Sequence, residues 1–189
     1  MNRRLFLYAG VAVAAAAGGY AYRTRQGGAA DAPTNTGTAA ESAPSAAASA
    51  DPVADLRALS LPDLDGATHR LDQWSGRPMV VNFWATWCAP CVKEMPELQA
   101  LHEKYPGIQF VGIGVDKAGN MRKFLKKVAV TYPLLVLEDG AIDRLRALGN
   151  PAGGLPFTLV FDENGDIHRK ILGQIQADDL DNTLSALVA

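Results

Sequence analysis

Cysteine, histidine and net charge are all scarce in this sequence of 189 residues, and each shortage excludes a class of protein. Two cysteines and three scattered histidines are too few for a disulfide-stapled scaffold or for a zinc site with regular ligand spacing. The net charge is only −2, so no strong positive field attracts a phosphate backbone. We therefore predict no nucleic-acid partner, no metal site and no cofactor.

The charge is unevenly placed, and the first part of the chain is basic. Residues 1–25 hold four arginines and no acid, and the 18 residues from Leu5 to Tyr22 carry no charge. As a helix this run would span about 27 Å, close to the thickness of a bilayer core. Its small residues would also suit a signal peptidase. We expect residues 1–25 to be either an uncleaved signal anchor, which would attach the chain to a membrane, or a removable signal peptide.

A second segment, residues 26–53, is rich in Ala, Ser, Thr, Gly and Pro and contains no aromatic residue. Such a stretch buries too little apolar area to offset the entropy lost on ordering, so we predict a disordered linker. As a flexible coil it would reach about 30 Å. The remaining residues, 54–189, are predicted to form the folded domain.

Strand and helix patterns alternate along this domain. Two short segments around the turn Asp65-Gly66 predict a small N-terminal β-hairpin, Leu59–Leu61 with His69–Leu71. Near-continuous apolar runs predict buried strands, and apolar residues at helical spacing predict the helices between them. The predicted order is strand 79–85, helix 89–105, strand 108–115, helix 120–130, strand 134–137, helix 140–148, strands 157–161 and 167–171, and helix 178–188. This order predicts an α/β fold with a central mixed β-sheet flanked by helices.

The most informative residues are Cys88 and Cys91, which are separated by two residues where a buried strand meets a helix. At a helix start, unpaired backbone N–H groups and the helix dipole favour a thiolate, so the pKa of Cys88 should lie below that of a free thiol. Cys91 lies one turn further along and should be shielded. We therefore expect Cys88 to attack a partner disulfide and Cys91 to resolve the mixed disulfide.

The residues around the cysteines agree with a redox dithiol. Pro90 suits the first turn of a helix, because that position needs no N–H donor. Val92 stands where haem attachment would require a histidine. The three histidines of the chain lack the spacing of a zinc site.

The segment from Asn82 to Pro96 resembles the thioredoxin superfamily, within its branch of membrane-tethered, TlpA/ResA-like thiol-disulfide oxidoreductases. The family pattern Cys-x-x-Cys-x-x-Glu-x-Pro is met at Cys88, Cys91, Glu94 and Pro96. The resemblance covers residues 54–189 and implies a thioredoxin-like fold.

The resemblance also implies roles for further residues. Pro156 matches the cis-proline that packs against the dithiol, and the backbone of Leu155 before it would pair with an extended substrate segment. Asn82 stands where typical thioredoxins carry a buried Asp, so Glu94 is the candidate for proton transfer at Cys91. Trp87 would shape the surface that meets the substrate.

The predicted function is therefore a thiol-disulfide oxidoreductase that reduces protein disulfides in the periplasm through Cys88 and Cys91. By resemblance, its substrates would be apocytochrome c or copper-site proteins, and a membrane thiol protein would donate the electrons. The domain would face the periplasm from the bacterial inner membrane, or be released there if the leader is cut. Two alternatives stay open: a thiol peroxidase of the peroxiredoxin-like branch, and a metallochaperone that uses the two thiols as ligands.

Overall fold

The computed structural model describes residues 51–189, so the predicted leader 1–25 and residues 26–50 of the predicted linker lie outside the described residues. The first element is helix α1, Pro52–Ala58, which begins inside the segment predicted to be linker. Asp51 caps this helix by accepting a hydrogen bond of 2.9 Å from the Val53 N–H, and Pro52 fits the first turn because no N–H is needed there. In the described part of the chain, no helix is long and apolar enough to span a bilayer.

A five-stranded mixed sheet forms the centre of the domain. Its strands in chain order are β3 (Met79–Trp84), β4 (Gln109–Gly114), β5 (Leu134–Val136), β6 (Phe157–Phe161) and β7 (Ile167–Leu172). They are arranged in the spatial order β5-β4-β3-β6-β7. The central strand β3 is parallel to β4 and antiparallel to β6. The order of elements predicted for this part of the chain is confirmed.

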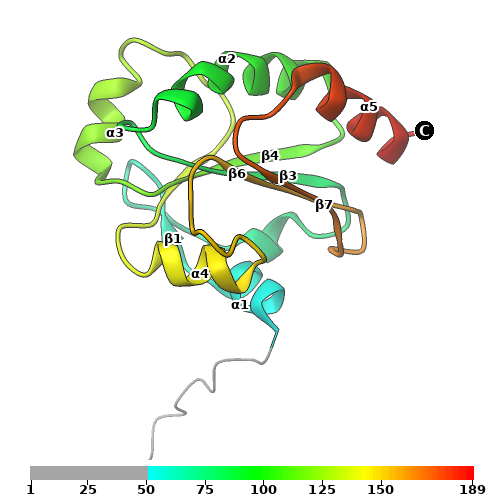
Figure 1. Ribbon diagram of the computed structural model, residues 1–189, viewed down its shortest axis with the longest axis horizontal. Helices are drawn as coiled ribbons and strands as arrows, with labels where there is room; N and C mark the ends of the chain where they lie inside the picture. The colour runs from blue at the N-terminus through cyan, green and yellow to red at the C-terminus, as the bar shows by residue number, and fades with distance from the viewer. Residues whose placement is uncertain (1–50) are drawn as a thin grey trace, which may run out of the picture. The chain divides into compact units, whose positions relative to one another are not determined.

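Helices cover both faces of the sheet (Figure 1). On one face, helices α2 (Ala89–Lys104), α3 (Ala118–Phe124) and α5 (Ala177–Leu187) bury apolar side chains against the sheet. On the other face, α1, the 3-10 helix η1 (Leu71–Trp74) and α4 (Ala141–Ala147) form a second apolar cluster with it. The architecture is the predicted α/β fold with a mixed sheet between two helical layers.

A short antiparallel pair, β1 (Leu61–Pro62) with β2 (Thr68–His69), precedes the sheet as predicted. The Asp63 carboxylate fixes its turn by accepting hydrogen bonds from the backbone N–H groups of Asp65 and Ala67. The second strand was predicted to continue to Leu71, and this is wrong. Leu71 instead starts η1 and is buried against the main sheet.

Helix α3 is shorter than predicted: it ends at Phe124, although the apolar spacing extends to Val130. After this segment the side chain of Gln99 on α2 accepts a hydrogen bond from the Thr131 N–H and donates one to the Thr131 hydroxyl, both at 2.8 Å. These bonds hold the chain in its path toward β5. Met121 is the only fully buried side chain of α3.

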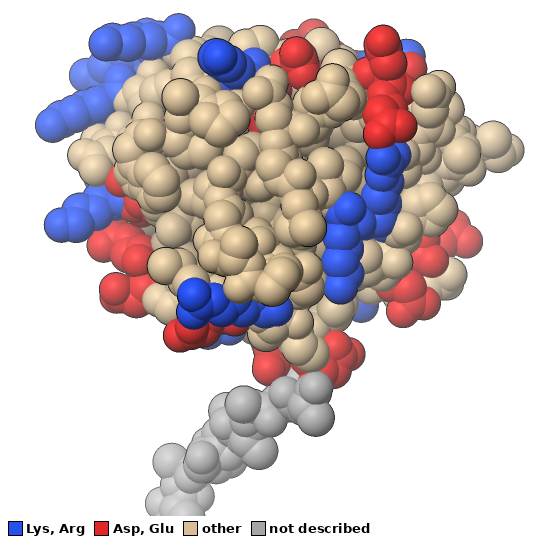
Figure 2. Space-filling view, in the orientation of Figure 1, with Lys and Arg blue, Asp and Glu red and all other residues tan. Residues whose placement is uncertain are grey.

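Charge is distributed unevenly over the surface of the domain. Figure 2 shows basic side chains projecting at the side where Figure 1 places α3, whereas acidic side chains gather at other edges of the same face. Residues 117–137 contain five basic residues and no acidic one. The domain therefore carries a local positive surface despite the negative net charge of the whole chain.

Candidate functional site

Cys88 and Cys91 form a disulfide at the start of α2. Cys88 is the N-cap residue of the helix, and its sulfur accepts a hydrogen bond of 3.3 Å from the Cys91 N–H. This is the position where the unpaired N–H groups and the helix dipole stabilise negative charge. Cys91 is fully buried, whereas Cys88 retains 6% exposure. The reduced form of this pair would therefore present Cys88 to a partner and keep Cys91 behind it.

The loop between β3 and α2 holds Cys88 in place. Trp84 ends β3 as a fully buried side chain and contacts the Phe124 ring at a centroid distance of 5.5 Å. Two residues further on, Thr86 is tied to Asp116, which follows β4: the Asp116 carboxylate accepts bonds from the Thr86 hydroxyl at 2.5 Å and the Thr86 N–H at 3.2 Å. The loop before Cys88 is thus held by the packing of Trp84 and by the hydrogen bonds between Thr86 and Asp116.

Asp116 is a site residue that the sequence reasoning missed. It also accepts hydrogen bonds from the Lys117 N–H and from the Asn120 side chain. Burial works against its charge, but the hydrogen bonds, with Thr86 and Asn120 foremost, outweigh it and hold the pKa of Asp116 below its usual range. Its position could have been predicted from the sequence. Parallel strands end at one edge of a sheet, so an acidic residue just after β4 lies beside the residues that follow β3.

Pro156 lies beside the same edge and is preceded by a cis peptide bond from Leu155. Strand β6 begins directly after it, and Phe157 of β6 is paired with Phe83 of β3. The start of β6 therefore adjoins the end of β3, from which the cysteine loop emerges. Leu155 packs against the apolar cluster that contains both cysteines. The structure thus brings Leu155 and Pro156 to the edge of the sheet from which the cysteine loop emerges.

Glu94 lies one helical turn after Cys91 and is completely buried. Its carboxylate accepts hydrogen bonds from the Asn82 amide at 2.8 Å and from the Ile175 N–H at 2.9 Å. Asn82 also donates to the Thr158 hydroxyl at 3.0 Å, a contact that the sequence did not reveal. Burial raises the pKa of Glu94 to about 7, although the two hydrogen bonds favour the charged form. The carboxyl group can therefore hold or release a proton near neutral pH.

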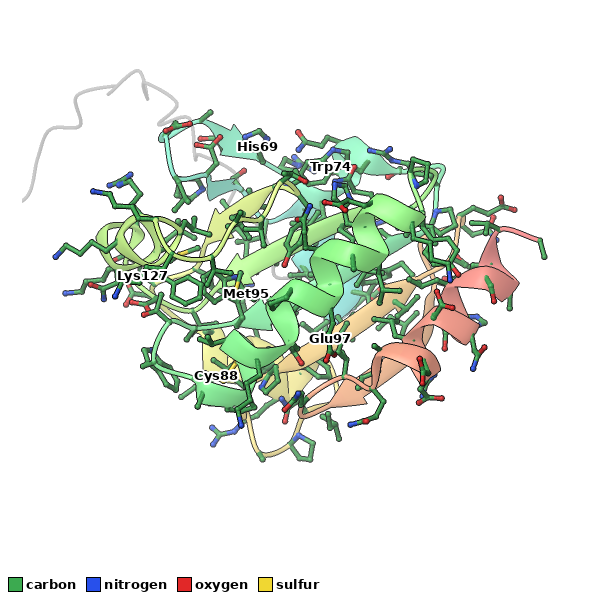
Figure 3. All side chains as sticks on the ribbon, turned by 90° about the horizontal axis from the view of Figure 1, so that it is seen from above. His69, Trp74, Cys88, Met95, Glu97 and Lys127 are labelled. Carbon is green, nitrogen blue, oxygen red and sulfur yellow. A yellow bond between two sulfur atoms is a disulfide. The ribbon has the colours of Figure 1, made fainter. Side chains whose placement is uncertain are left out.

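The residues on either side of Cys88 in the chain, and Gly154 before Leu155, are exposed and apolar or small. Trp87, next to Cys88, is 69% exposed, and Ala89, Pro90 and Gly154 are also exposed. Figure 3 shows Cys88 at the end of the molecule where α2 begins, with Met95 further along the same helix. An exposed indole beside a sulfur with little accessible surface favours recognition of a flat or extended partner rather than of a ligand enclosed in a cavity.

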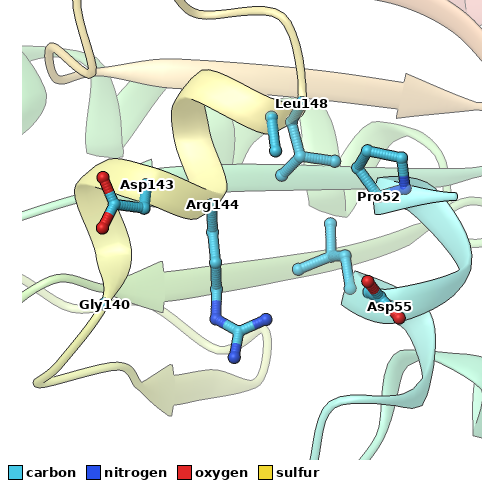
Figure 4. Close-up of a pocket in the computed structure, with 8 residues that line it drawn as sticks. Pro52, Asp55, Gly140, Asp143, Arg144 and Leu148 are labelled. Carbon is cyan, nitrogen blue, oxygen red and sulfur yellow. The ribbon is translucent and has the colours of Figure 1, made fainter. Parts of the chain in front are cut away.

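A hollow of about 480 Å³ lies elsewhere, between α1 and α4 (Figure 4). Its lining includes Pro52, Leu56, Arg144 and Leu148. Leu56 and Leu148 belong to the apolar cluster on the face of the sheet opposite to α2. The hollow is therefore separated from the disulfide by the sheet. Within residues 51–189, no three His, Cys, Asp or Glu side chains are grouped so that they could hold a metal ion.

Comparison with known proteins places this arrangement in context. The model of the AhpC/TSA family matches residues 52–170. The chain is 32% identical over 130 residues to the thiol-disulfide oxidoreductase ResA of Geobacillus thermodenitrificans, which covers 67% of this chain and 72% of that protein.

Solved structures agree with this comparison. The structure of dsbF from Mycobacterium tuberculosis matches with a TM-score of 0.62 at 27% identity, covering 70% of this chain and 96% of that one. A thiol:disulfide interchange protein of the thioredoxin family from Chlorobium tepidum matches with a TM-score of 0.61 at 25% identity, covering 69% and 93%. The predicted resemblance to the thioredoxin superfamily is confirmed.

Proposed function

The chain belongs to the AhpC/TSA family, and we propose that it is a thiol-disulfide oxidoreductase whose Cys88–Cys91 pair exchanges with the disulfides of other proteins. The observation that carries this proposal is the disulfide at the start of α2, with Cys88 as the helix cap and Cys91 buried behind it. The names of its relatives, thiol-disulfide oxidoreductase and thiol:disulfide interchange protein, support the same activity.

The proposed reaction begins with the reduced dithiol. The Cys88 thiolate attacks one sulfur of the substrate disulfide, forms a mixed disulfide and releases the other substrate sulfur as a thiolate. Cys91 then loses its proton and attacks the Cys88 sulfur, which frees the second substrate thiol and closes the Cys88–Cys91 disulfide. Two electrons pass from the dithiol to the substrate, and a dithiol donor must return them before the next cycle. The N–H of Cys91, which points at the Cys88 sulfur, supports the first step.

Glu94 is proposed to serve the second step. It lies on the same face of α2 as Cys91, both side chains are fully buried, and its pKa is raised to about 7 by burial. Cys91 must lose a proton in a place that bulk water does not reach, so a nearby group that titrates near neutral pH would accept it. Asn82 keeps that carboxyl in place and cannot itself take up the proton.

Pro156, Leu155 and Trp87 are proposed to hold the substrate. Leu155 lies at the edge of the sheet from which the cysteine loop emerges, and its backbone is proposed to pair with an extended chain. The exposed indole of Trp87 would cover the substrate on the other side of Cys88.

The cellular setting belongs to the same proposal. Residues 1–25 read as a signal anchor or signal peptide, so the domain would work in the periplasm, attached to the inner membrane or released from it. There it would reduce the disulfides of apocytochrome c or of copper-site proteins, with a membrane thiol protein as the electron donor. These partners are inferred from the TlpA/ResA-like resemblance.

Trapping the mixed disulfide tests the assigned roles. Cys91→Ser should accumulate disulfide-linked partners through Cys88, because the resolving thiol is gone, and non-reducing electrophoresis would reveal them. Cys88→Ser should form none and should not reduce insulin disulfides. Turnover by Cys88→Ser would contradict the proposal. Consumption of hydroperoxide at a rate comparable to insulin reduction would favour the peroxidase alternative instead.

A further inference from the structure

The surface next to the disulfide carries a cluster of lysines that the proposed reaction does not use. We name Lys117, Lys123, Lys126 and Lys127 the basic patch; all four side chains are exposed. Within residues 51–189 none of them takes part in an ion pair. Arg122, the fifth basic residue of this segment, differs because its guanidinium donates to the Leu64 carbonyl.

The acid nearest in sequence to the basic patch, Asp116, forms no ion pair with its lysines within residues 51–189. The Asp116 carboxylate is occupied by donors from Thr86, Lys117 and Asn120, of which only the Lys117 contribution comes from the patch, and that through its backbone N–H. The next acidic residue along the chain is Glu138. Four like charges on one short segment, none of them in an ion pair within residues 51–189, repel one another, so this arrangement does not serve the stability of the domain.

A hollow joins the basic patch to the loop that carries Cys88. It measures about 300 Å³ and is lined by Thr86, Asn120, Lys123, Phe124 and Lys127. Thr86 is two residues before Cys88, so a chain that reaches the sulfur from this side passes the ammonium groups of Lys123 and Lys127. Figure 2 shows the basic side chains projecting beside a broad neutral surface, and Figure 3 shows Lys127 toward the same end of the molecule as Cys88.

We infer that the basic patch selects protein partners whose reactive cysteines are flanked by acidic residues. This inference rests on the proposed function and adds the partner's chemistry to it. A carboxylate-bearing segment bound in the hollow would place its disulfide beside Cys88 and face the lysines, which form no ion pair within residues 51–189. Anionic lipid head groups would also attract lysines, but a lipid surface gives no reason for the hollow to open toward the cysteine loop.

The test uses the full chain in its reduced form and three synthetic peptides that share one disulfide loop and differ only in flanking residues: four Glu, four Gln or four Lys. Thiol release gives the second-order rate constant for each peptide. At low ionic strength the Glu peptide should react about tenfold faster than the Gln peptide, and the Lys peptide more slowly. In 0.5 M NaCl the three rates should come together, because salt screens exposed charges.

A double variant isolates the basic patch. Lys123→Gln with Lys127→Gln should reduce the rate with the Glu peptide to that with the Gln peptide and leave the Gln peptide unaffected. The matched control removes two exposed basic residues elsewhere, Arg146→Gln on α4 with Lys170→Gln on β7, and should preserve the preference. Equal rates for all three peptides, or equal effects of the two double variants, would overturn this inference and leave the proposed function standing.

Two further outcomes also decide the question. If none of the peptides is reduced, the proposed function fails and this inference fails with it. If the Lys123/Lys127 double variant lowers co-sedimentation with phosphatidylglycerol vesicles but leaves the Glu peptide preference intact, the patch recognises lipid and the inference is overturned.

Discussion

The Glu94 carboxylate accepts a hydrogen bond of 2.8 Å from the Asn82 amide, and both side chains are buried beneath the start of α2. Asparagine cannot titrate, so within this pair the proton can reside only on Glu94. The contact therefore combines a group whose protonation changes near neutral pH with a neighbour that fixes its position. Its effects should be visible in both stability and exchange kinetics.

Glu94→Gln should change how the stability of the oxidised protein depends on pH. The pKa of Glu94 is raised by burial from 4.5 to about 7, so between these values the unfolded chain releases the proton first and stability falls as pH rises. Above pH 7 the accumulated loss is about 3 kcal/mol. Glutamine removes this pH dependence, because its amide does not ionise. Urea unfolding at pH 5 and pH 8 measures the difference.

Glu97→Gln is the matched control for this prediction. It lies on the same helix, about one turn further along, and its side chain is only partly buried. Its variant should keep the fall in stability between pH 5 and pH 8, moved slightly to lower pH because the charge of Glu97 contributes to the raised pKa of Glu94. If Glu94→Gln and the wild type lost stability in parallel between pH 5 and pH 8, Glu94 would not be the group responsible.

The rate of disulfide exchange should also respond to Glu94. If the carboxyl accepts the proton of Cys91, the wild-type rate of insulin reduction has an inflection near pH 7, where Glu94 changes its charge. Glu94→Gln should lose this inflection and react more slowly, by about 10-fold at pH 7. An unchanged pH profile would assign Glu94 a purely structural role.

Asp116→Asn should loosen the loop that carries Cys88. The amide cannot accept all the donors that the carboxylate satisfies, so the bonds to Thr86 would be weakened or lost. We expect a loss of about 1–3 kcal/mol in the free energy of unfolding and a slower reaction of the reduced protein with iodoacetamide at Cys88. Asp139→Asn, an exposed acid at the turn before α4, is the control and should change neither. Unchanged Cys88 reactivity in Asp116→Asn would show that the anchor does not position the sulfur.

Trp87→Ala should separate substrate recognition from chemistry. With 69% of its surface exposed, the indole contributes little to the core, so the free energy of unfolding should change by less than about 0.5 kcal/mol. Reduction of insulin should slow several-fold, whereas reduction of the small neutral substrate hydroxyethyl disulfide should be nearly unaffected. Val188→Ala removes a half-exposed apolar side chain from the end of α5 and serves as the control. Equal losses with both substrates would place Trp87 in the chemical step.

Two glycine variants test how α3 is attached to the sheet. A Cβ on Gly114 would overlap the thioether of Met121, which is completely buried, so Gly114→Ala should cost about 1–3 kcal/mol. A Cβ on Gly119 meets nothing within 4 Å, and Gly119→Ala should instead stabilise the helix by up to about 1 kcal/mol. Thermal unfolding of the two variants measures this contrast, and a destabilised Gly119→Ala would contradict it.

Much of the site could be predicted from local sequence. The spacing of Cys88 and Cys91 before an amphipathic run located the start of α2, and apolar runs located β3, β4, β5 and β6. Strand β7, which alternates in burial, was located by the turn Glu163-Asn164-Gly165 before it. The short helix α1 was missed because it buries only Leu56 and therefore leaves almost no periodic pattern.

Contacts between distant segments could not be predicted in this way. Thr86 and Asp116 are 30 residues apart, and Asn82 and Thr158 are 76 apart. Each pair meets only because the sheet places β4 and β6 on either side of β3. The bonds from Gln99 on α2 to Thr131 likewise join residues 32 apart. Side-chain partners that depend on strand order are invisible to a pattern read along the chain.

The low burial of α3 has a consequence for engineering. Only Met121 of this helix is fully buried, so its outward side chains can be exchanged while the sheet, the cysteines and Glu94 keep their surroundings. A version with glutamates in place of Lys123 on this helix and of Lys127 after its end, both exposed, should remain folded and be retargeted toward cationic partners. The choice of protein partner could then be changed without changing the redox chemistry of the cysteines.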